Sequence, residues 1–507
     1  MVRWLKRSLL ALVVLLVLMI VAGAAYVYFK PLPVSPNMLL NVALGRGLDA
    51  THAPEFAADH LRAPPGFSVT LYARLPKVRM LRFTAGGDLL ASRPRLGEVV
   101  LLGSSDADGQ PRLRVLLSGL DKPHGIDIAN GWLYVGESDA IGRVRFDENT
   151  GQLQSDYERI VTGLTGDGFH WTKTVRIGPD GYLYVAQGSS CNVCAETDKR
   201  RATIMRFKPD GSDGEIYARG LRNSVGMDWA PWNGQLYATD NGRDLLGDNF
   251  PPDELNRIVE GGFYGWPYIN GFGVLDPDMG AGKAALLNKA IAPVYGFRAH
   301  NAPLGIHFLR SARMPAGYEH AALVALHGSW NRSVKDGYKV VALHWRDDGS
   351  IDATDFLTGF EKNGRVVGRP VDIAEGPDGA LYISDDYAGA IYRVAYGEAA
   401  AADEQPAVVP TPVPQTDSGL QALSPAERAQ LSAWGEAVYD RYPCRSCHDP
   451  RTASGLHRAL VLKKLSSRYT LAQLQNFFTA PTPPMPLIPL DARERRALAV
   501  YLLTRDR

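Results

Sequence analysis

The chain of 507 residues is too long for one ordinary domain and predicts two or three. Its composition is that of a globular protein, with 45% hydrophobic and 21% charged residues. The formal net charge of +1 removes any broad electrostatic basis for binding nucleic acid, so no nucleic-acid partner is expected. The 51 glycines and 34 prolines favour a fold of short strands and tight turns over a helical bundle.

The N-terminus carries a membrane signal. Arg3, Lys6 and Arg7 precede an uncharged apolar run at residues 9–29. As a helix this run is about 30 Å long, which is enough to cross the hydrocarbon core of a bilayer. Positive flanks stay in the cytoplasm. We therefore expect residues 1–30 to be a transmembrane anchor in the inner membrane, with the rest of the chain in the periplasm.

A cleaved secretory signal peptide is the alternative interpretation of this segment. The small residues at 22–24 resemble a cleavage site. The apolar run is long for a signal peptide, however, and it ends in an aromatic cluster at residues 26–29 that suits the membrane interface. These features favour a retained anchor, and both interpretations export the rest of the chain.

One pattern returns over residues 66–397, after a proline-containing leader at residues 31–65. A turn rich in Gly, Asp or Asn leads into a short apolar strand that ends in small or polar residues. Copies recur about every 45–55 residues, which predicts an all-β six-bladed propeller, with a pair of β-sandwiches as the alternative. A longer gap at residues 242–301 predicts an inserted loop region. The six copies begin at Gly86, Asn130, Asp180, Asn233, His320 and Asp378.

The composition changes after the propeller. Residues 398–421 are rich in Ala, Pro, Glu and Thr and predict a partly extended linker. Ser424 and Glu427 have the spacing of a capping box at a helix N-terminus. Residues 492–504 are amphipathic and predict a closing helix. The sequence therefore predicts an all-α C-terminal domain at residues 422–507.

The segment CRSCH in this domain holds Cys444, Cys447 and His448. Two thiols at this spacing on a turn can form thioethers to both vinyl groups of a porphyrin, and the adjacent histidine then reaches the iron. A zinc or thiol-redox role is the alternative. Met485, the only methionine after the motif, is the expected second iron ligand because a thioether is soft and neutral. Residues 424–507 resemble the class I cytochromes c, so we expect covalently bound haem c.

A second pair of cysteines, Cys191 and Cys194, lies in the loop after the third core strand. In an exported protein this pair favours a disulfide, because a metal site needs two further soft ligands. We expect the disulfide to hold a loop near the mouth of the pocket.

Several polar residues lie at strand ends or in connecting loops of different repeats, at a similar phase. Each has a simpler explanation, because a histidine near a strand is more often a satisfied structural group and a loop arginine can pair with a carboxylate. Their recurrence at one phase favours convergence on the central channel instead. The candidates are His124, His170, Arg222, Asn223, His327 and Arg369.

An acidic stretch follows the fourth repeat. Asp240, Asn241, Asp244 and Asp248 provide hard oxygen ligands, and Gly242 allows a neighbouring carbonyl to point inward. This chemistry suits Ca²⁺. A solvated acidic loop is the alternative, and the spacing is not that of an EF-hand.

The segments GLRN, DELN and GGFYGWP, with the stretch at residues 369–382, carry a family resemblance. Through them, residues 63–396 resemble the glucose/sorbosone dehydrogenase family, which are six-bladed quinoproteins that use pyrroloquinoline quinone (PQQ). The resemblance also implies a role for individual positions. These are His170 as the catalytic base, Arg222 and Asn223 as contacts of the quinone, Arg369 as the partner of a PQQ carboxylate, and the carbonyls around Gly242 and Arg243 as calcium ligands.

Three positions depart from the family pattern. Val371 stands where the glucose dehydrogenases have a second arginine, and His327 replaces a lysine of their pocket. Phe169 precedes the base, where a carboxylate could have oriented it. The PQQ site is still expected, but the departures lean toward the sorbosone and pyranose branch rather than toward glucose.

The expected function is a membrane-anchored periplasmic dehydrogenase that oxidises a sugar or a sugar-derived aldehyde of the aldose, pyranose or sorbosone type. His170 takes a proton and Arg222 stabilises charge on the quinone oxygen, while His124 and His327 contribute to cofactor binding. Electrons pass from PQQ to the chain's own haem, and then to a downstream acceptor of the respiratory chain. A calcium-dependent propeller lactonase and a non-catalytic binding propeller that carries an electron-transfer cytochrome are the alternatives. The fused cytochrome argues against hydrolysis, which releases no electrons.

Overall fold

The computed structural model describes residues 54–105, 111–362, 364–397, 419–441, 444, 448, 462, 465–467, 469–479 and 490–505. The chain divides into two compact units, residues 1–399 and 400–507, each of which is described by itself. The predicted anchor at residues 1–30, most of the leader and of the linker, Cys447 and Met485 lie outside the described residues. Among the helices that are described, none is long and apolar enough to cross a membrane.

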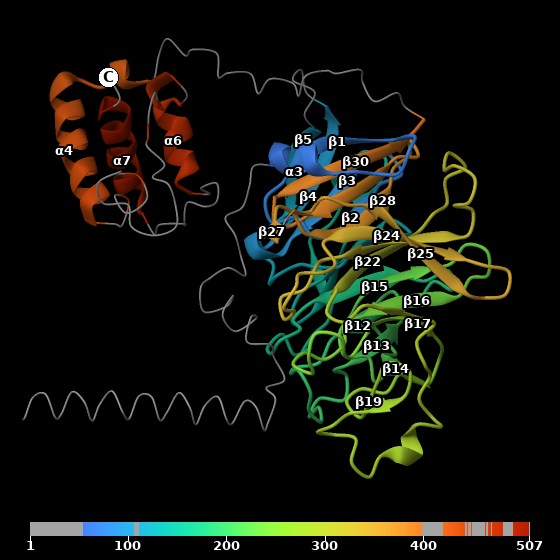
Figure 1. Ribbon diagram of the computed structural model, residues 1–507. Helices are drawn as coiled ribbons and strands as arrows, with labels where there is room; N and C mark the ends of the chain where they lie inside the picture. Colours follow the sequence, from blue (N-terminus) through green and yellow to red (C-terminus); the bar gives the residue numbers. More distant parts are fainter. Residues whose placement is uncertain are drawn as a thin grey trace, which may run out of the picture. The chain divides into compact units, whose positions relative to one another are not determined.

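The first unit is a propeller of six blades, each built on four antiparallel strands, with one further short strand in the second and third blades (Figure 1). The first three blades are β2 (Leu81–Phe83), β3 (Leu89–Arg93), β4 (Glu98–Ser105) and β5 (Pro111–Leu117); β6 (Ile126–Ala129), β7 (Trp132–Gly136), β8 (Ile141–Asp147) and β10 (Glu158–Val161); and β11 (Lys173–Ile177), β12 (Leu183–Gln187), β13 (Thr203–Phe207) and β14 (Glu215–Arg219). The last three are β15 (Ser224–Trp229), β16 (Leu236–Asp240), β17 (Asp253–Ile258) and β21 (Tyr295–Phe297); β22 (Pro303–Phe308), β23 (Ala321–Leu326), β24 (Lys339–Trp345) and β25 (Ile351–Leu357); and β28 (Pro370–Glu375), β29 (Leu381–Asp385), β30 (Ala390–Tyr396) and β1 (Phe67–Arg74).

The two ends of the propeller segment close the ring together. Strand β1 pairs antiparallel with β30, so the sixth blade takes one strand from the start of the segment and three from its end (Figure 1). Phe67 lies opposite Tyr396 in this pairing, with ring centroids 5.0 Å apart. The innermost strand of each blade contacts the innermost strands of both neighbouring blades around the axis.

Apolar side chains between the blades form the core. Each pair of neighbouring blades encloses one cluster, such as Val100 with Tyr382 between the first and sixth blades and Val341 with Tyr237 between the fifth and fourth. A blade is therefore covered on both faces, which explains why β12 is buried along its whole length rather than at alternate residues.

The predicted six-bladed propeller is confirmed, and each sequence repeat leads into the second strand of one blade, β3, β7, β12, β16, β23 or β29. The prediction of a loop region at residues 242–301 is only partly right. This stretch holds β17 and β21, which complete the fourth blade, and β18 (Gly262–Phe263), which adds a parallel strand to the third. It also holds the hairpin β19 (Ile269–Asn270) and β20 (Val274–Leu275) and the 3-10 helix η2 (Ala284–Leu286).

Short elements complete the propeller unit. They are helix α3 (Pro54–His60), η1 (Pro94–Leu96), strand β9 (Gln152–Leu153), and the hairpin of β26 (Glu361–Lys362) with β27 (Arg365–Val366).

The second unit is helical, as predicted. Its elements are η3 (Leu420–Ala422), α4 (Pro425–Arg441), η4 (Leu465–Ser467), α6 (Leu471–Phe477) and α7 (Ala492–Arg505). The backbone N–H of Glu427 donates to Ser424 Oγ at 3.2 Å, so the predicted cap of α4 is present. Helices α4 and α7 lie side by side (Figure 1), and a Cβ on Gly435 of α4 would collide with the carbonyl oxygen of Ala497 in α7. Glycine at this position therefore permits the close contact of the two helices.

Candidate functional site

The residues predicted to line the site of the propeller lie at one of its ends, which we call the polar end. There each chain segment enters the innermost strand of a blade: His124 precedes β6, His170 precedes β11, Arg222 and Asn223 precede β15, and Arg369 precedes β28. His327 follows β23, which runs antiparallel to β22 and so ends where β22 begins. The residues form two groups. The His170 group is His170, Ser189, Asn192, Arg222 and Asn223, and the His327 group is Arg79, His124, His327, Arg369 and Asp386.

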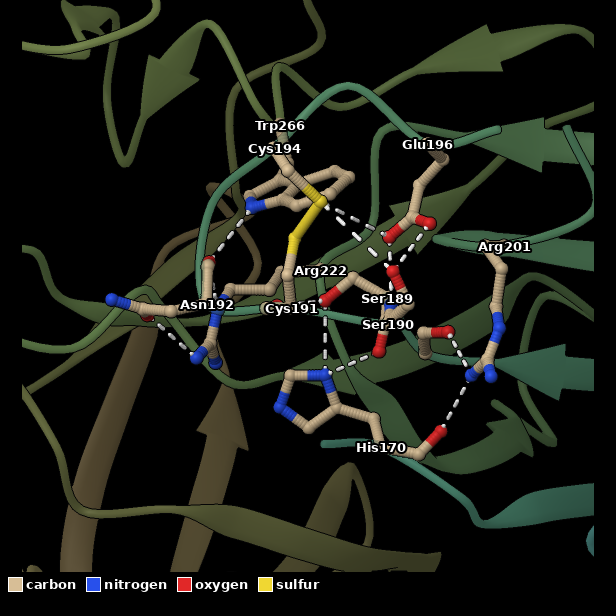
Figure 2. The surroundings of a disulfide bond; sticks show 11 residues. His170, Ser189, Ser190, Cys191, Asn192, Cys194, Glu196, Arg201, Arg222 and Trp266 are labelled. Carbon is tan, nitrogen blue, oxygen red and sulfur yellow. Dashed lines mark hydrogen bonds between the residues drawn. A yellow bond between two sulfur atoms is a disulfide. The ribbon is translucent and has the colours of Figure 1, made fainter. Parts of the chain in front are cut away.

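His170 is held in one tautomer. Its Nδ1 lies 2.9 Å from both the carbonyl oxygen and Oγ of Ser189 (Figure 2). The Ser189 hydroxyl donates its single hydrogen to the carbonyl of Cys191 at 2.7 Å, so both Ser189 atoms accept from His170. Nδ1 therefore carries the hydrogen and Nε2 carries the lone pair. No hydrogen bond within the described part of the chain involves that Nε2.

The imidazole of His170 is also neutral. Burial, and then the positive charge of Arg222, lower its pKa to about 3. Its surroundings are close: a Cβ placed on Gly188 would lie 2.6 Å from both His170 Cβ and Asn223 Oδ1. A neutral histidine with an uncommitted Nε2 has the properties of a general base.

Arg222 is a buried cation with many partners. Its Nε and Nη2 donate to the carbonyl oxygen and Oδ1 of Asn192, both at 2.9 Å. Nη2 also donates to Asp244 Oδ2 at 2.9 Å, and Nη1 donates to the carbonyl of Asn241 at 3.1 Å. Burial lowers the pKa of Arg222, but a guanidinium stays charged in proteins. Arg222 therefore does pair with a loop carboxylate, as the simpler explanation expects. It also lies beside His170, so both interpretations of this residue apply.

Two further cations hold the loop that carries His170. Arg201 donates to the carbonyls of His170 at 2.9 Å and of Gly188 at 3.2 Å (Figure 2). Lys173 Nζ donates to the carbonyls of Ser138 at 2.7 Å and of Thr165 and Trp171 at 3.2 Å. Burial lowers the pKa of Lys173 to about 7, while three carbonyl acceptors match the three hydrogens of its ammonium form.

The His327 group is organised around a carboxylate. Asp386 accepts from Arg79 Nη1 at 2.6 Å and lies 2.9 Å from His327 Nε2. Burial raises the pKa of Asp386, but the charge of Arg79 and the hydrogen bond from His327 lower it by more, so Asp386 is ionised and acts only as an acceptor. Burial, and then the charge of Arg369, lower the pKa of His327 to about 4. His327 is therefore neutral, with its hydrogen on Nε2.

Two neighbours complete this group. Arg369 donates from Nε to the carbonyl of His327 at 3.0 Å and from Nη2 to that of Gly328 at 3.1 Å. Arg79 Nη2 approaches His124 Nε2 at 3.5 Å. Since a guanidinium only donates, Nε2 of His124 faces it as the acceptor and the hydrogen lies on Nδ1.

The acidic stretch is used mainly for internal hydrogen bonds. Asp240 accepts the backbone N–H groups of Arg222 and Asn223 at 2.9 and 2.6 Å. Asp244 accepts from Arg222 and from Asn331 Nδ2 at 3.0 Å. Within the described ranges, the one group of three side chains placed to hold a metal is Cys191, Cys194 and Glu196, and two of these form a disulfide.

Backbone oxygens of this stretch remain for calcium. No hydrogen bond among the described residues ends on the carbonyl of Gly242 or Arg243, whereas those of Asn241 and Asp244 accept from Arg222 and Asn192. Gly242 does not have a positive φ; the reason for glycine is that a Cβ would lie 2.8 Å from the carbonyl oxygen of Pro252. The carbonyl ligands therefore stay a prediction that the geometry permits, while Asp240 and Asp244 have other partners.

The polar end has the features of a site for an anionic, hydrogen-bonding molecule. Buried side-chain atoms without a hydrogen-bond partner in the described ranges gather there: Arg79 Nε, His124 Nδ1, Gln187 Oε1 and Asn223 Oδ1. The polar end holds the guanidinium groups of Arg79, Arg222 and Arg369, of which Arg79 pairs with Asp386 and Arg222 with Asp244. Burial, and then Glu254, raise the pKa of Asp240 well above its usual range, which adds to the positive balance. The residues present thus fit PQQ, whose carboxylates require cations.

The departures from the family pattern occupy distinct places. Val371 packs with Val225 and Leu304, each on the innermost strand of a different blade, in a small apolar cluster. Phe169 is 70% exposed beside His170. An aliphatic residue on the inner strand and an open aromatic next to His170 distinguish this site chemically from one that holds a second arginine and a carboxylate.

Comparisons with known proteins identify the propeller. A family model described as Glucose / Sorbosone dehydrogenase matches residues 133–393, about half of the chain. The chain belongs to this family. An uncharacterized protein of Borreliella burgdorferi is 34% identical over 367 residues, which cover 68% of this chain and 93% of that protein. The aldose sugar dehydrogenase YliI of Escherichia coli K12 is 24% identical over 291 residues, which cover 52% of this chain and 72% of that enzyme.

Solved structures agree on the fold. The holo form of the PQQ domain of pyranose dehydrogenase from Coprinopsis cinerea has a TM-score of 0.56 and 22% identity, covering 66% of this chain and 97% of that one. A calcium structure of a Trichoderma reesei carbohydrate-active enzyme of family AA12 has a TM-score of 0.58 at the same identity and coverage. Family membership makes this protein an oxidoreductase.

Several site residues escape prediction from sequence. Arg79 and Asp386 could have been found by phase, because Arg79 precedes β2 as Arg369 precedes β28, and Asp386 follows β29 as His327 follows β23. Ser189 is separated from the end of β12 by one glycine, so it lies at nearly the same place in its blade as Asp386 does after β29. Asn192 has no such signal, because it lies within the loop that the disulfide closes.

Proposed function

We propose that this protein is a PQQ-dependent dehydrogenase of a sugar or a sugar-derived aldehyde of the aldose, pyranose or sorbosone type. The observation that carries the proposal is His170, a neutral imidazole with its hydrogen held on Nδ1 and its Nε2 uncommitted, beside the buried charge of Arg222. Support comes from the family match and from relatives named aldose sugar dehydrogenase, quinoprotein glucose dehydrogenase B and PQQ-dependent pyranose dehydrogenase.

The chain's own residues have separate tasks in this reaction. His170 accepts the proton of the donor's hydroxyl group at Nε2, while Ser189 keeps the ring from turning. Arg222 and the side chain of Asn223 favour negative charge that develops next to them. Arg79 and Arg369, with the neutral His124 and His327, form the wall that holds anionic carboxylates in place.

PQQ when bound supplies a quinone that takes two electrons from the donor carbon, which no side chain can do. The His327 group, Arg222 and Asn223 are the residues that would hold it. The carbonyls of Gly242 and Arg243 would hold a calcium ion, which would supply Lewis-acid chemistry. Both roles are part of the proposal.

A reconstitution experiment tests this function. The purified protein is loaded with PQQ and Ca²⁺, and reduction of an added dye is followed over aldoses, sorbosone and simple alcohols. We expect sugar-dependent reduction that needs both additions and that EDTA abolishes and Ca²⁺ restores. Hydrolysis of a lactone panel without dye reduction would favour the lactonase, and no turnover with any donor would favour the non-catalytic propeller.

We further propose that the helical unit carries haem c and receives the electrons. Cys444 and His448 lie one helical turn apart, with the His448 N–H donating to the Cys444 carbonyl at 3.0 Å, and Cys444 packs against the apolar core of that unit. Cys447 and Met485 complete the motif in sequence. Haem that stays attached in a denaturing gel, and that is lost in Cys444→Ala/Cys447→Ala, is the expected result. A shifted spectrum in Met485→Ala tests the second ligand.

The proposal for the cellular location rests on the N-terminal sequence alone. We propose that residues 1–30 retain the protein in the inner membrane, with both units in the periplasm and a respiratory-chain acceptor downstream. Membrane fractionation of the full chain against a version that starts after Lys30 tests the anchor. Equal recovery of both in the soluble fraction would contradict it.

A further inference from the structure

The loop at residues 188–196, here the disulfide loop, is closed at two levels. A disulfide joins Cys191 and Cys194, as expected from the sequence (Figure 2). Below it, Glu196 accepts from the N–H and the hydroxyl of Ser190 at 2.7 and 2.8 Å. The disulfide therefore constrains only the tip of the loop, and Glu196 holds its base independently.

Asn192 lies at this tip, between the two cysteines, and contacts Arg222 twice. Its carbonyl oxygen accepts from Arg222 Nε and its Oδ1 accepts from Arg222 Nη2, both at 2.9 Å (Figure 2). These two N–H groups form one edge of the planar guanidinium. Because two oxygens of one residue accept from this edge, they fix both the position and the plane of the guanidinium. A carboxylate does the same in a bidentate pair.

The same side chain connects Arg222 to its carboxylate. Asn192 Oδ1 accepts from the backbone N–H of Asp244 at 2.8 Å, and its Nδ2 donates to the Asp244 carbonyl at 3.1 Å. Asp244 in turn accepts from Arg222 Nη2 at 2.9 Å. Three polar atoms of Asn192, namely Oδ1, Nδ2 and the carbonyl oxygen, thus form hydrogen bonds with Arg222 or Asp244. Trp266 Nε1 also donates to the Asn192 carbonyl, at the longer distance of 3.4 Å.

The disulfide loop also reaches His170. Ser189 donates to the Cys191 carbonyl at 2.7 Å and accepts from His170 Nδ1. The tip of one loop therefore contacts both groups that the proposed mechanism uses, the base through Ser189 and the cation through Asn192. A structural disulfide elsewhere on the surface would contact neither.

We propose that Asn192 is the positioning residue for the Arg222 guanidinium and that the Cys191–Cys194 disulfide holds Asn192 in place. The role of Arg222 in turnover rests on the proposed function, whereas the positioning of Arg222 by Asn192 does not. Four of the five guanidinium N–H groups have acceptors, and two of these four end on Asn192. Without Asn192 the guanidinium can tilt within its cavity while Asp244 and Asn241 still bind it.

The test uses four variants of the full chain. Asn192→Ala removes the side-chain contacts, and Cys191→Ser/Cys194→Ser frees the loop tip but leaves Glu196 in place. Asn331→Ala is the matched control, because Asn331 binds the other oxygen of Asp244 at 3.0 Å without an Arg222 contact. Asn192→Asp is the conservative variant, since it keeps the acceptor for Arg222.

The first readout needs no cofactor. Solvent exchange of the Arg222 side-chain N–H groups is measured by heteronuclear NMR with labelled arginine, and the signal is assigned by its loss in Arg222→Lys. We expect about tenfold faster exchange in Asn192→Ala and in the double serine variant, recovery in Asn192→Asp, and wild-type exchange in Asn331→Ala. Unchanged exchange in Asn192→Ala would overturn the proposal.

The second readout is steady-state kinetics of the protein loaded with PQQ and Ca²⁺. A misplaced cation lowers kcat by about tenfold to a hundredfold in Asn192→Ala, with KM within about threefold, because Arg222 acts on developing charge and not on substrate binding. A purely structural loop would instead lower stability in all variants with kcat intact. If the wild-type protein shows no turnover, the proposed function fails, while the exchange result still decides the positioning role.

Discussion

His170 and His327, one from each group at the polar end, are both neutral, but their hydrogens are held on opposite ring nitrogens. His170 gives its Nδ1 hydrogen to Ser189 and keeps Nε2 as an acceptor. His327 lies with Nε2 against the ionised Asp386, so its hydrogen is on Nε2. Burial lowers both pKa values, to about 3 and about 4. His170 and His327 are therefore both neutral, but they present different ring nitrogens as the acceptor.

The partners explain the difference. Asp386 pairs with Arg79, while the acceptors of Arg369 among the described residues are carbonyls, so the His327 group keeps an excess positive charge that is suited to hold an anionic ligand. The described hydrogen bonds of the His170 ring are to uncharged atoms of Ser189, which set the tautomer without adding negative charge. The comparison predicts that loss of His170 affects turnover and that changes in the His327 group affect binding and stability.

The largest expected effect is that of His170→Ala. Turnover falls by about a hundredfold to ten-thousandfold, the usual range for a general base, while the dissociation constant of PQQ changes little. Dye-reduction kinetics and quinone absorbance measure the two quantities. His344→Ala is the control, because His344 lies half-buried on β24, the third strand of its blade, and bonds to Gly317 and Thr354 rather than to a residue of the polar end. A full-rate His170→Ala enzyme would end the assignment of this residue as the base.

Arg222→Lys is expected to lower kcat by about tenfold to a hundredfold, since lysine keeps the charge but cannot use the two oxygens of Asn192 together. The parallel change Arg369→Lys in the His327 group should instead weaken PQQ binding with a smaller effect on kcat. Steady-state kinetics with quinone titration separates the two outcomes. Identical kinetic profiles for both variants would remove the distinction between the groups.

Asp386→Asn should lower the free energy of unfolding by about 1–3 kcal/mol, because it leaves Arg79 as a largely buried charge without its ion-pair partner. Urea unfolding of the cofactor-free protein measures this change. Asp352→Asn is a suitable control, since its ion pair with Arg346 is more than half exposed and contributes little. Equal stability of Asp386→Asn and the wild type would show that Asp386 is not needed to compensate this charge.

The smallest expected effect is in the pH profile. With a pKa of about 3, His170 stays neutral throughout the range from pH 5 to pH 8, so its titration changes kcat/KM by less than about twofold there. In the unfolded chain the same histidine binds a proton near pH 6.5, so it lowers the stability of the folded state as pH falls from about 6.5 toward 3. Rate measurements across this range test the first statement. An acid limb centred near pH 6.5 that His170→Gln abolishes would contradict it.

The repeats were predictable because each blade must contribute a turn and a buried second strand to the same layer. The turns at Gly86 and Asp378 could therefore be recognised as copies of one repeat, although they lie in the first and last blades. The strands β17 and β21 were not predicted, because they lie in an irregular stretch with no repeat pattern. The pairing of β1 with β30 was not predicted either, since it joins residues more than 300 positions apart.

The site was predictable to the same extent. His124, His170 and Arg369 could be assigned to one end of the propeller because residues at the same phase of different blades must face the same way. Asp240 and Asp244 were expected to bind calcium, yet they accept N–H groups of Arg222 and its neighbours. Composition shows that oxygen ligands are present but does not show where each oxygen points.

The sequence by itself determined the propeller, its number of blades and the end at which the polar residues gather, because short-range turn and strand patterns repeat with a fixed phase. Only the tertiary structure decided which partner each polar side chain meets. Asn192 with Arg222, Ser189 with His170 and Asp386 with His327 and Arg79 are contacts between separate loops. Such contacts set tautomers and charges, and they depend on how the blades close around the axis rather than on any local pattern.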